Sequence, residues 1–481
     1  MLHAMIWYDD VHQQVLSRLL KIDLRIDMHK VAVVGMGYSG AILVERLKHL
    51  TPALKVDVYD PTGSTGSGRA YQRDNLNNLV NRPASLMYLR EHGDFKHWLR
   101  ESPVTHAKSY QPRPVFGRFI EETLKSSLRA HSAIQYHRER VIGITTEQGC
   151  YSLETASGEC VGYSAVVLAT GNSEPTDIYR LKGIERYINN PYPTTKLADI
   201  RSGSIGVLGN QLSAIDVALT LLDAHPDNHV TMLTRSSKIP NYCEHYYPRP
   251  LKVLNESNLK QRLRGTGSVL KTVQAMFDEE LGAHGIQVNI EALMHDHTQA
   301  SVAREAIYSV FSSTNLIVPM IWNLLSERDR KVFVGRYRSA WRQLRVPIPK
   351  ENWSKIHQYI HSGRLACKTG LADVSFSGDQ FVARGRDFQC AFSDLVNATG
   401  AGDVMEGALY KKLTASGICV QHQYGGIDVR FDDCRVINEM GPTNIFAIGA
   451  PTAGVFYAVS NIDVLQMQAE IIYKNLRALG A

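Results

Sequence analysis

The stretch Lys30-Val-Ala-Val-Val-Gly35-Met-Gly37-Tyr-Ser-Gly40-Ala contains a short apolar run, a glycine turn and the start of a helix. Gly35 permits a tight turn, Gly37 lets the backbone approach a pyrophosphate, and Gly40 lets the helix pack close to the strand. The N-terminus of that helix would face the phosphates. This spacing predicts a strand–helix unit that binds a dinucleotide.

The flanking sequence supports the same interpretation. A strand is expected over Val31–Val34, a helix over Ser39–Leu50, and a second strand over Lys55–Tyr59 that ends at Asp60. Asp60 lies about twenty residues beyond Gly40, where a carboxylate binds the ribose hydroxyls of adenosine. The predicted cofactor-binding residues of this unit are Gly35, Gly37, Tyr38, Ser39, Gly40 and Asp60.

Composition narrows the class of protein. At 481 residues the chain is too long for one ordinary core, which suggests two or three domains. With 44% hydrophobic and 21% charged residues it resembles a soluble globular protein. The net charge of +6 is spread along the chain, so it does not argue for nucleic acid, and no apolar run is long enough to span a membrane.

The seven cysteines are scattered and never form a Cys-x-x-Cys pair. That usage favours a reducing compartment, so we expect a cytoplasmic protein. It also removes the redox pair that disulfide reductases require. Met1–Asp27 has no signal-peptide architecture, and Met28 begins where a first strand of this kind usually begins. We therefore expect Met28 to be the natural start and residues 1–27 to be an extension, either an over-extended reading frame or a dispensable helix.

A long functional loop is expected from Asp60 to Gly93. Its segment Gly66-Ser-Gly-Arg-Ala-Tyr71 offers several backbone amides to a second phosphate or a ring. The apolar run Ala165-Val-Val-Leu-Ala-Thr-Gly171 indicates a buried parallel strand. A turn is expected between these two stretches, at Asn81–Met87. From the two stretches and this turn we predict further contacts to the first cofactor at Gly66, Gly68, Tyr71, Asn81, Thr170 and Gly171.

A second nucleotide unit follows at Ser204–Asp216, with a partner strand at His229–Leu233. Gln211 stands where the second glycine should be, so a side chain would hinder close approach to a pyrophosphate. Arg235 lies where NADP-selective sites place a cation against the 2′-phosphate. Gly209, Ser213 and Arg235 are the predicted NAD(P)H contacts. The alternative is a degenerate domain kept for packing.

Residues 241–362 are mostly helical and irregular in pattern and are predicted to roof a substrate pocket. A second Ala-Thr-Gly ends at Gly400 and a last strand ends at Gly449, and we predict that both glycines contact a cofactor. The predicted fold is α/β, with two Rossmann-like dinucleotide-binding domains and a largely helical insertion. The predicted division is 28–190 and 401–481 for the first domain, 200–240 and 363–400 for the second, and 241–362 for the insertion.

This ordered set of motifs resembles the flavoproteins with two dinucleotide-binding domains. Three stretches look like one branch, the FAD-NAD(P)-binding family. They are Gly66-Ser-Gly-Arg-Ala-Tyr71, Leu79-Val-Asn81-Arg-Pro-Ala84 and Phe95-Lys-His-Trp98-Leu. A fourth set of residues is similar to the helical middle of that family: Trp322-Asn-Leu-Leu, Arg330, Phe333 and Trp341-Arg-Gln-Leu-Arg345. The resemblance covers nearly all of residues 28–475 and implies FAD in the first site and NADPH or NADH in the second.

One departure concerns the terminal motif. Many such flavoproteins have Gly-Asp there, whereas this chain reads Gly449-Ala450-Pro451. The FAD contact that the Asp makes in those proteins must then come from a backbone amide or be absent.

A flavin with NAD(P)H and no cysteine pair points to oxygen activation or to direct reduction of an organic acceptor. We therefore expect an FAD-dependent, NAD(P)H-consuming monooxygenase of a small nitrogen-containing molecule, because the family's relatives include urate-hydroxylating and N-hydroxylating enzymes. A urate-like heterocycle is the first candidate, and an amino acid or amine the second. The alternatives are a reductase or dehydrogenase that inserts no oxygen, and a non-catalytic flavin-binding protein.

No motif assigns a catalytic acid or base. Weak candidates are His245, just after the second nucleotide unit, Asn172, directly after the first Ala-Thr-Gly, and Asn461, at the start of the last helix. The basic cluster around Arg345 would bind an anionic substrate or a phosphate, or else form a solvated helix face. The only partner expected is a small-molecule substrate, with no metal, and the sequence does not give the oligomeric state.

Overall fold

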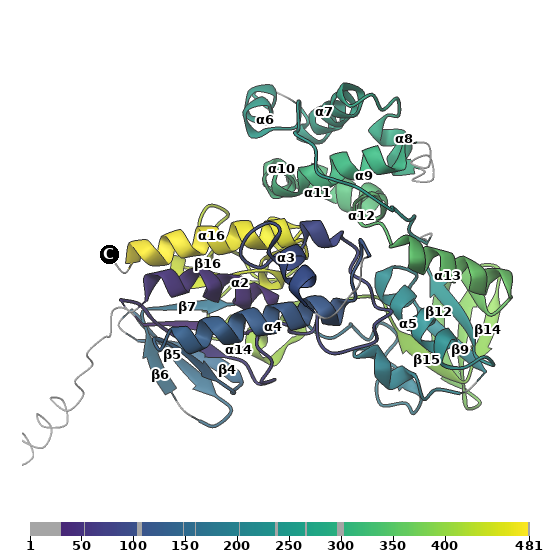
Figure 1. The fold of residues 1–481 in the computed structure, drawn as a ribbon, viewed down its shortest axis with the longest axis horizontal. Helices are drawn as coiled ribbons and strands as arrows, with labels where there is room; N and C mark the ends of the chain where they lie inside the picture. The colour runs from purple at the N-terminus through teal and green to yellow at the C-terminus, as the bar shows by residue number, and fades with distance from the viewer. Residues whose placement is uncertain are drawn as a thin grey trace, which may run out of the picture.

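The computed structural model describes residues 30–51, 53–102, 108–147, 149–158, 160–201, 203–235, 239–264, 267–295 and 303–479. The predicted extension and the predicted start at Met28 lie outside these residues. Figure 1 shows three parts: an α/β unit at the left, a second one at the right, and a layer of helices above them. This arrangement confirms the predicted fold class.

The first α/β unit is built on a six-stranded sheet in the order β16-β17-β7-β1-β2-β3. All its pairs are parallel except that of β16 with β17, and Val31 of β1 lies between Val56 of β2 and Ala165 of β7. The central strands are apolar and buried, as parallel strands covered on both faces must be. The bounds are β1 Lys30–Val34, β2 Lys55–Tyr59, β3 Ile134–His137, β7 Ala165–Leu168, β16 Arg435–Asn438 and β17 Gly441–Ala447.

Helices and a small sheet cover this unit. Helices α2 and α16 pack against each other, and α4 lies beside α2 (Figure 1). An antiparallel sheet of β4, β5 and β6 packs against the central strands, and α14 packs on β4. The bounds are α2 Tyr38–Leu47, α3 Asp94–Glu101, α4 Arg113–Ala130, β4 Val141–Glu147, β5 Cys150–Thr155, β6 Cys160–Tyr163, α14 Ala408–Ala415, α15 Ala453–Phe456 and α16 Ile462–Leu479.

The second α/β unit has a parallel sheet in the order β11-β10-β9-β15-β8 and an antiparallel sheet of β12, β13 and β14. Helix α5 packs on β9 and β10, and α13 packs on α5 and β11. The bounds are β8 Tyr187–Ile188, β9 Ser204–Leu208, α5 Leu212–Ala224, β10 His229–Thr234, α13 Lys350–His361, β11 Leu365–Thr369, β12 Leu371–Ser377, β13 Gln380–Gly385, β14 Gln389–Phe392 and β15 Asp394–Asn397.

Two predicted domain boundaries differ from the structure. Strand β8 pairs with β15 of the second sheet, although we predicted that the first domain runs to residue 190. Helix α13 covers the second α/β unit, although we predicted that the insertion runs to residue 362 (Figure 1). Both elements are amphipathic or short, and their sequences do not reveal which sheet they join.

The helical layer contains α6 to α12 and rests on the first unit. Its buried residues belong to the same hydrophobic cluster as the core of that unit. The indole Nε1 of Trp322 donates to the carbonyl of Gly454 at 2.7 Å, and the amide of Asn323 donates to that of Val455 at 2.7 Å. The bounds are α6 Glu256–Arg262, α7 Val269–Ala283, α8 Ile290–His295, α9 Arg304–Ser313, α10 Val318–Leu324, α11 Glu327–Val332 and α12 Arg338–Arg345.

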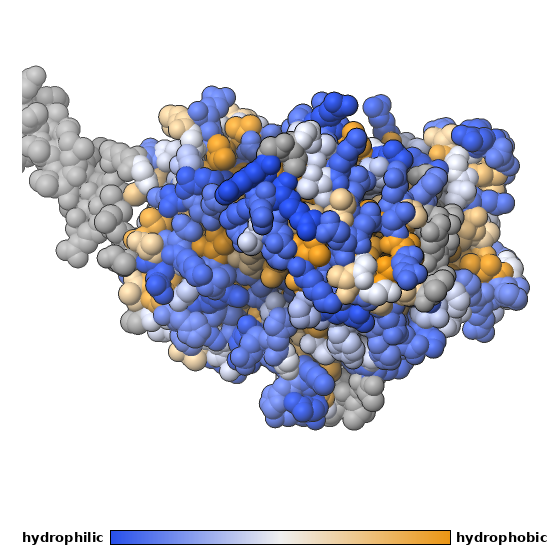
Figure 2. Space-filling view, turned by 90° about the horizontal axis from the view of Figure 1, so that it is seen from above, coloured by the Kyte–Doolittle hydropathy of each residue, from blue (hydrophilic) through white to orange (hydrophobic). Residues whose placement is uncertain are grey.

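Seen from above, the molecule shows a mostly hydrophilic face with separate apolar spots (Figure 2). Among the described residues, no helix is both long and apolar enough to cross a membrane.

Candidate cofactor and substrate sites

One large cavity of about 1220 Å³ opens at the carboxyl edge of the first sheet. The parallel strands β1, β2 and β7 all end there, so the segments that follow them meet. This is where open α/β sheets bind ligands. Ten of the residues that we singled out line the cavity: Gly35, Gly37, Tyr38, Ser39, Asp60, Gly68, Tyr71, Thr170, Gly171 and Asn172.

The glycine turn is built by close backbone contacts. Gly35 has φ +104°, and a Cβ there would overlap the carbonyl oxygen of Ala169. A Cβ on Gly40 would overlap the carbonyl of Gly35, so α2 packs on the turn as predicted. A Cβ on Gly37 would come no closer than 3.6 Å to Gly68. Local packing therefore requires glycine at positions 35 and 40 but not at position 37. Gly37 lines the cavity, although a side chain there would meet no backbone clash.

Asp60 holds the turn as well as lining the cavity. One carboxylate oxygen accepts from the backbone N–H of Met36 at 2.9 Å. The other accepts from the N–H and hydroxyl of Thr62 at 2.9 and 2.6 Å. The carboxylate thus joins the ends of β1 and β2 and keeps lone pairs available at the cavity wall.

The loop after β2 is positioned by Gly66 and Gly68. Gly66 has φ +96°, its N–H donates to the carbonyl of Met36 at 2.8 Å, and a Cβ there would overlap Ile120 and Leu124 of α4. A Cβ on Gly68 would approach the Cα of Gly37 to 2.8 Å. Gly40 and Gly66 therefore shape the site from behind its wall.

Tyr71 presents a ring to the cavity. It packs edge-on against Phe116 with the ring centroids 4.8 Å apart. Burial raises the pKa of Tyr71 to about 12, so its phenol is protonated at neutral pH and is a hydrogen-bond donor.

The sequence analysis missed two walls. Residues 139–142, at the start of β4, and residues 404–410, before and in α14, both line the cavity. Thr170 and Tyr410 share a hydrogen bond of 2.7 Å between their hydroxyls, which fixes the second of these walls against the Ala-Thr-Gly turn. Residues 139–142 begin with the charged pair Glu139-Arg140 and residues 404–410 contain Gly407, but neither stretch has the spacing of a nucleotide fingerprint, so the topology is what brings them to the cavity.

The terminal strand reaches the cavity one residue later than expected. The N–H of Gly449 donates to Oε1 of Gln468 at 3.0 Å, and Gly449 lies behind the wall, whereas Ala450 lines it. A Cβ on Gly449 would come to 2.8 Å from the hydroxyl of Ser39. Asn81 is half-buried and lies outside the lining of the cavity.

The three weak catalytic candidates lie in different surroundings. Asn172 is exposed on the cavity wall. Asn461 accepts from the backbone N–H of Asp463 at 2.8 Å, so its side chain caps α16, a structural role. His245 is exposed and does not line the cavity. The structure does not bring these three residues together.

The second nucleotide unit places its predicted residues at one edge of the second sheet. Gly209, Arg235 and Gly400 follow the carboxyl ends of the parallel strands β9, β10 and β15. Gly209 has φ +111° and Gly400 has φ +101°. Ser213 lies in the first turn of α5, two residues after Gln211, whose Nε2 donates to the side chain of Asn210 at 2.8 Å. Arg235 is exposed at this edge.

A buried ion pair joins the two α/β units. Arg113 of α4 lies 2.7 Å from the carboxylate of Asp216 in α5, and the hydroxyl of Tyr192 donates to the same carboxylate at 2.9 Å. Burial lowers the pKa of Arg113, but Asp216 outweighs this effect and the pKa ends above its usual range.

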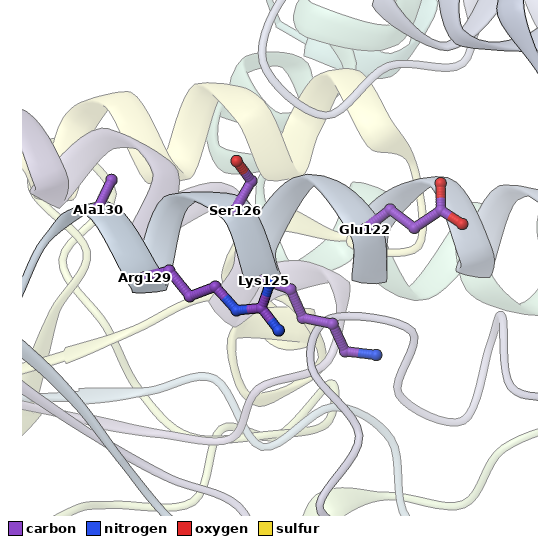
Figure 3. A pocket seen from close by; sticks show the side chains of 5 residues that line it. All are labelled: Glu122, Lys125, Ser126, Arg129 and Ala130. Carbon is purple, nitrogen blue, oxygen red and sulfur yellow. The ribbon is translucent and has the colours of Figure 1, made fainter.

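A shallow hollow of about 490 Å³ lies on the outer face of α4. Figure 3 shows that the side chains of Lys125 and Arg129 extend to the same side of the helix. All five lining residues come from this one helix, so the hollow lacks the converging groups of a binding site. Among the described residues, no group of three or more His, Cys, Asp or Glu is placed to hold a metal ion.

Comparison with known proteins gives distant relatives. The chain is 20% identical over 303 residues to the uncharacterized protein YdhS of Escherichia coli, covering 53% of this chain and 55% of that protein. It is 23% identical over 239 residues to a ferredoxin–NADP reductase of Gluconobacter oxydans, covering 46% of this chain and 66% of that protein. The matches thus span between half and two thirds of these curated relatives.

The fold itself extends over almost the whole chain. Ornithine hydroxylase from Pseudomonas aeruginosa superposes with a TM-score of 0.59 at 16% identity, covering 94% of this chain and 99% of that one. Residues 32–173 match the model of a family described as FAD-NAD(P)-binding, which is the family that the motifs indicated. This match covers the part of the first α/β unit that runs from β1 to the turn after β7.

Proposed function

We propose that the chain is an FAD-dependent, NAD(P)H-consuming monooxygenase that acts on a small nitrogen-containing substrate. The observation that carries this proposal is the cavity at the carboxyl edge of β1, β2 and β7, with a glycine turn at its base. The match of this domain to the FAD-NAD(P)-binding family supports the same cofactor.

The residues present fit FAD in this cavity. The turn at Gly37 faces the cavity with no side chain, which suits a pyrophosphate at the start of α2. The carboxylate of Asp60 suits the ribose hydroxyls of the adenosine. Tyr71 and Ser460, farther along the wall, would contact the flavin ring.

The second edge fits a nicotinamide dinucleotide less tightly. Gly209 keeps the sharp turn, and Arg235 supplies a cation for a 2′-phosphate. Gln211 places a side chain at the start of α5, where the fingerprint has glycine. We infer NADPH rather than NADH from the arginine.

Bound FAD would supply hydride acceptance and the reaction of its reduced form with oxygen. The chain's own residues would bind and orient the two cofactors and exclude water. The helical layer, fixed to α15 through Trp322 and Asn323, is suited to the last task. The cysteines whose side chains the structure describes form no disulfide: Cys150, Cys243, Cys367, Cys390, Cys419 and Cys434.

An amino acid or amine is now the first substrate class to test, ahead of a urate-like heterocycle. One structural neighbour, from Pseudomonas aeruginosa, is an ornithine hydroxylase. The second candidate function is an NAD(P)H-dependent reductase without oxygen insertion, because one curated relative is named a ferredoxin–NADP reductase.

Isotope labelling separates the two functions. The holoenzyme is incubated with NADPH, the test substrate and ¹⁸O-labelled dioxygen, and the product is examined by mass spectrometry. A product heavier by one labelled oxygen supports the monooxygenase. NADPH oxidation with every label recovered in peroxide or water, for L-lysine, L-ornithine and urate alike, favours the reductase.

A further inference from the structure

Two arginines, Arg82 buried and Arg345 half-buried, lie at the junction of the first α/β unit and the helical layer, outside the lining of the cofactor cavity. Arg82, which is only 8% exposed, follows Asn81 in the long loop, and Arg345 ends α12. Both arginines are connected by hydrogen bonds to the carboxylate of Asp463, in the first turn of α16. Arg82 donates to its two oxygens at 3.0 Å, and Arg345 reaches it through Asn315.

This junction holds more positive charge than negative. Two guanidinium groups face the single carboxylate of Asp463, and no second carboxylate of the described chain pairs with either arginine. The other titratable groups around them are phenols, those of Tyr88, Tyr246 and Tyr457. An uncompensated buried charge is costly, so its presence calls for an explanation.

Several donors at the junction have no partner. The Nε and Nη1 of Arg82 and the Nε of Arg345 are buried and make no hydrogen bond within the described part of the chain. The hydroxyl of Tyr457 is likewise buried and unpaired. Native structures leave few such groups unsatisfied, and each costs about 1–3 kcal/mol when buried alone.

Tyr457 connects the junction to the cofactor cavity. It has φ +57°, a conformation rarely found outside glycine, and it stands two residues before Val459, which lines the cavity together with Ser460. Strained residues of this kind gather at functional sites. Its ring stacks on Trp322 with the centroids 4.6 Å apart, and Phe333 packs edge-on at 5.5 Å.

The pKa shifts of the two arginines differ: burial lowers the pKa of Arg345, whereas Asp463 and the nearby phenols outweigh burial and raise the pKa of Arg82. Burial lowers the pKa of Arg345 to about 10, a shift that Tyr457 and Asp463 only partly offset. Burial raises the pKa of Tyr457, against the opposing effect of Arg342, Arg338 and Arg345. At neutral pH both arginines are charged and Tyr457 is protonated, so all three present hydrogen-bond donors.

We propose that Arg82, Arg345 and Tyr457 form an anion subsite that holds a carboxylate or an equivalent anionic group of the substrate, next to the Val459–Ser460 end of the cofactor cavity. The unpaired guanidinium N–H groups match such an anion, because charge-assisted bonds to carboxylates are the strongest that arginine makes. The aromatic rings of Trp322 and Phe333 would shield it from water. This inference rests on the proposed function and adds the charge of its substrate.

The test uses the oxidised holoenzyme and pairs of probes that differ by a carboxylate. L-lysine is compared with cadaverine, and benzoate with benzamide, and urate serves as a ring anion. Binding is followed through the visible spectrum of the bound flavin. L-lysine, benzoate and urate each carry an anionic group, the first two a carboxylate. We expect at least one of these three probes to shift the spectrum, and its carboxylate-free match, where it has one, to bind at least tenfold more weakly.

Variants separate the subsite from a merely structural cluster. Arg345→Gln should weaken binding of the responding anion at least tenfold, Tyr457→Phe a few-fold, and Arg345→Lys should restore part of the loss. The matched control is Arg336→Gln, an exposed arginine just before α12 that pairs with Glu291 at 3.2 Å, and it should bind like wild type. Flavin content and melting temperature show that each variant is folded.

The inference is overturned if none of L-lysine, benzoate and urate shifts the spectrum. It is also overturned if Arg345→Gln binds the responding probe as tightly as wild type does. Failure of the proposed function would appear differently, as a protein that takes up no FAD or whose flavin NADPH does not reduce. A holoenzyme that is reduced by NADPH but ignores these anions would reject only the subsite.

Discussion

The two nucleotide turns of this chain have the same topology but different side chains. In the first, Gly35, Gly37 and Gly40 bring strand, loop and helix into backbone contact around a large cavity. In the second, only Gly209 is kept, and Gln211 and Ala214 carry side chains where the fingerprint has glycines. A cofactor that stays bound through catalysis needs the first geometry. A cofactor that must leave after each turnover is served by the second.

The largest expected effect comes from closing the first turn. Gly37→Val places two methyl groups toward the cavity without a backbone clash, so the fold should persist while the affinity for FAD falls at least about 100-fold, or about 2.7 kcal/mol. FAD titration of the apoprotein measures this. Gly335→Val is the matched control, because a Cβ there meets nothing within 4 Å. If Gly37→Val binds FAD as tightly as wild type does, the pyrophosphate of FAD does not bind at this turn.

Ligand-dependent melting compares the two turns directly. A ligand that binds only the folded chain stabilises it by RT ln(1 + [L]/Kd). FAD at 100 times its Kd should therefore add about 2.7 kcal/mol to apoprotein stability. NADP⁺ at the same concentration should raise the melting temperature less than FAD does. Equal shifts from the two ligands would mean that the side chains at the second turn do not loosen it.

The next effect concerns the choice of nicotinamide cofactor. Arg235→Ala removes the exposed cation after β10, so kcat/KM for NADPH should fall about tenfold while that for NADH stays the same, since one charge-assisted contact contributes about 1.5–3 kcal/mol at most. Steady-state rates with both donors show this. Arg129→Ala, on the outer face of α4, is the control. If kcat/KM for NADH falls by the same factor, Arg235 instead supports the structure of the carboxyl edge of the second sheet.

The smallest expected effect is at Gln211. Gln211→Gly restores the fingerprint and should tighten NADPH binding about threefold to tenfold, because removing the side chain opens the approach to the pyrophosphate but adds backbone freedom. Equilibrium binding to the oxidised holoenzyme measures it. Weaker binding by the glycine variant would show that the Gln211 side chain contacts the cofactor.

The strongly periodic parts of the fold were predictable from the sequence. The apolar run at β1 and the spaced glycines indicated the first unit, and the Thr170–Gly171 turn was expected at the same cavity. These features are local, because strand burial and turn geometry depend on the pattern of consecutive residues. The family resemblance then supplied the order of the domains and the cofactors.

The remaining features depend on long-range packing. Nothing in the local sequence assigns β8 to the second sheet or brings residues 404–410 to the cavity wall. Asn461 was a weak catalytic candidate from its position alone, and its role as the cap of α16 appears only when the hydrogen bond to Asp463 is seen. The pairing of Arg82 with Asp463 spans 381 residues, which no spacing rule reaches.

The most direct test is anaerobic mixing of the purified protein with NADPH while the visible absorbance of the flavin is followed. The account predicts a yellow protein with bound FAD that NADPH bleaches, either alone or once a substrate such as L-lysine or urate is present. A protein that cannot take up FAD, or a bound flavin that stays oxidised with NADPH and NADH under all these conditions, would contradict it.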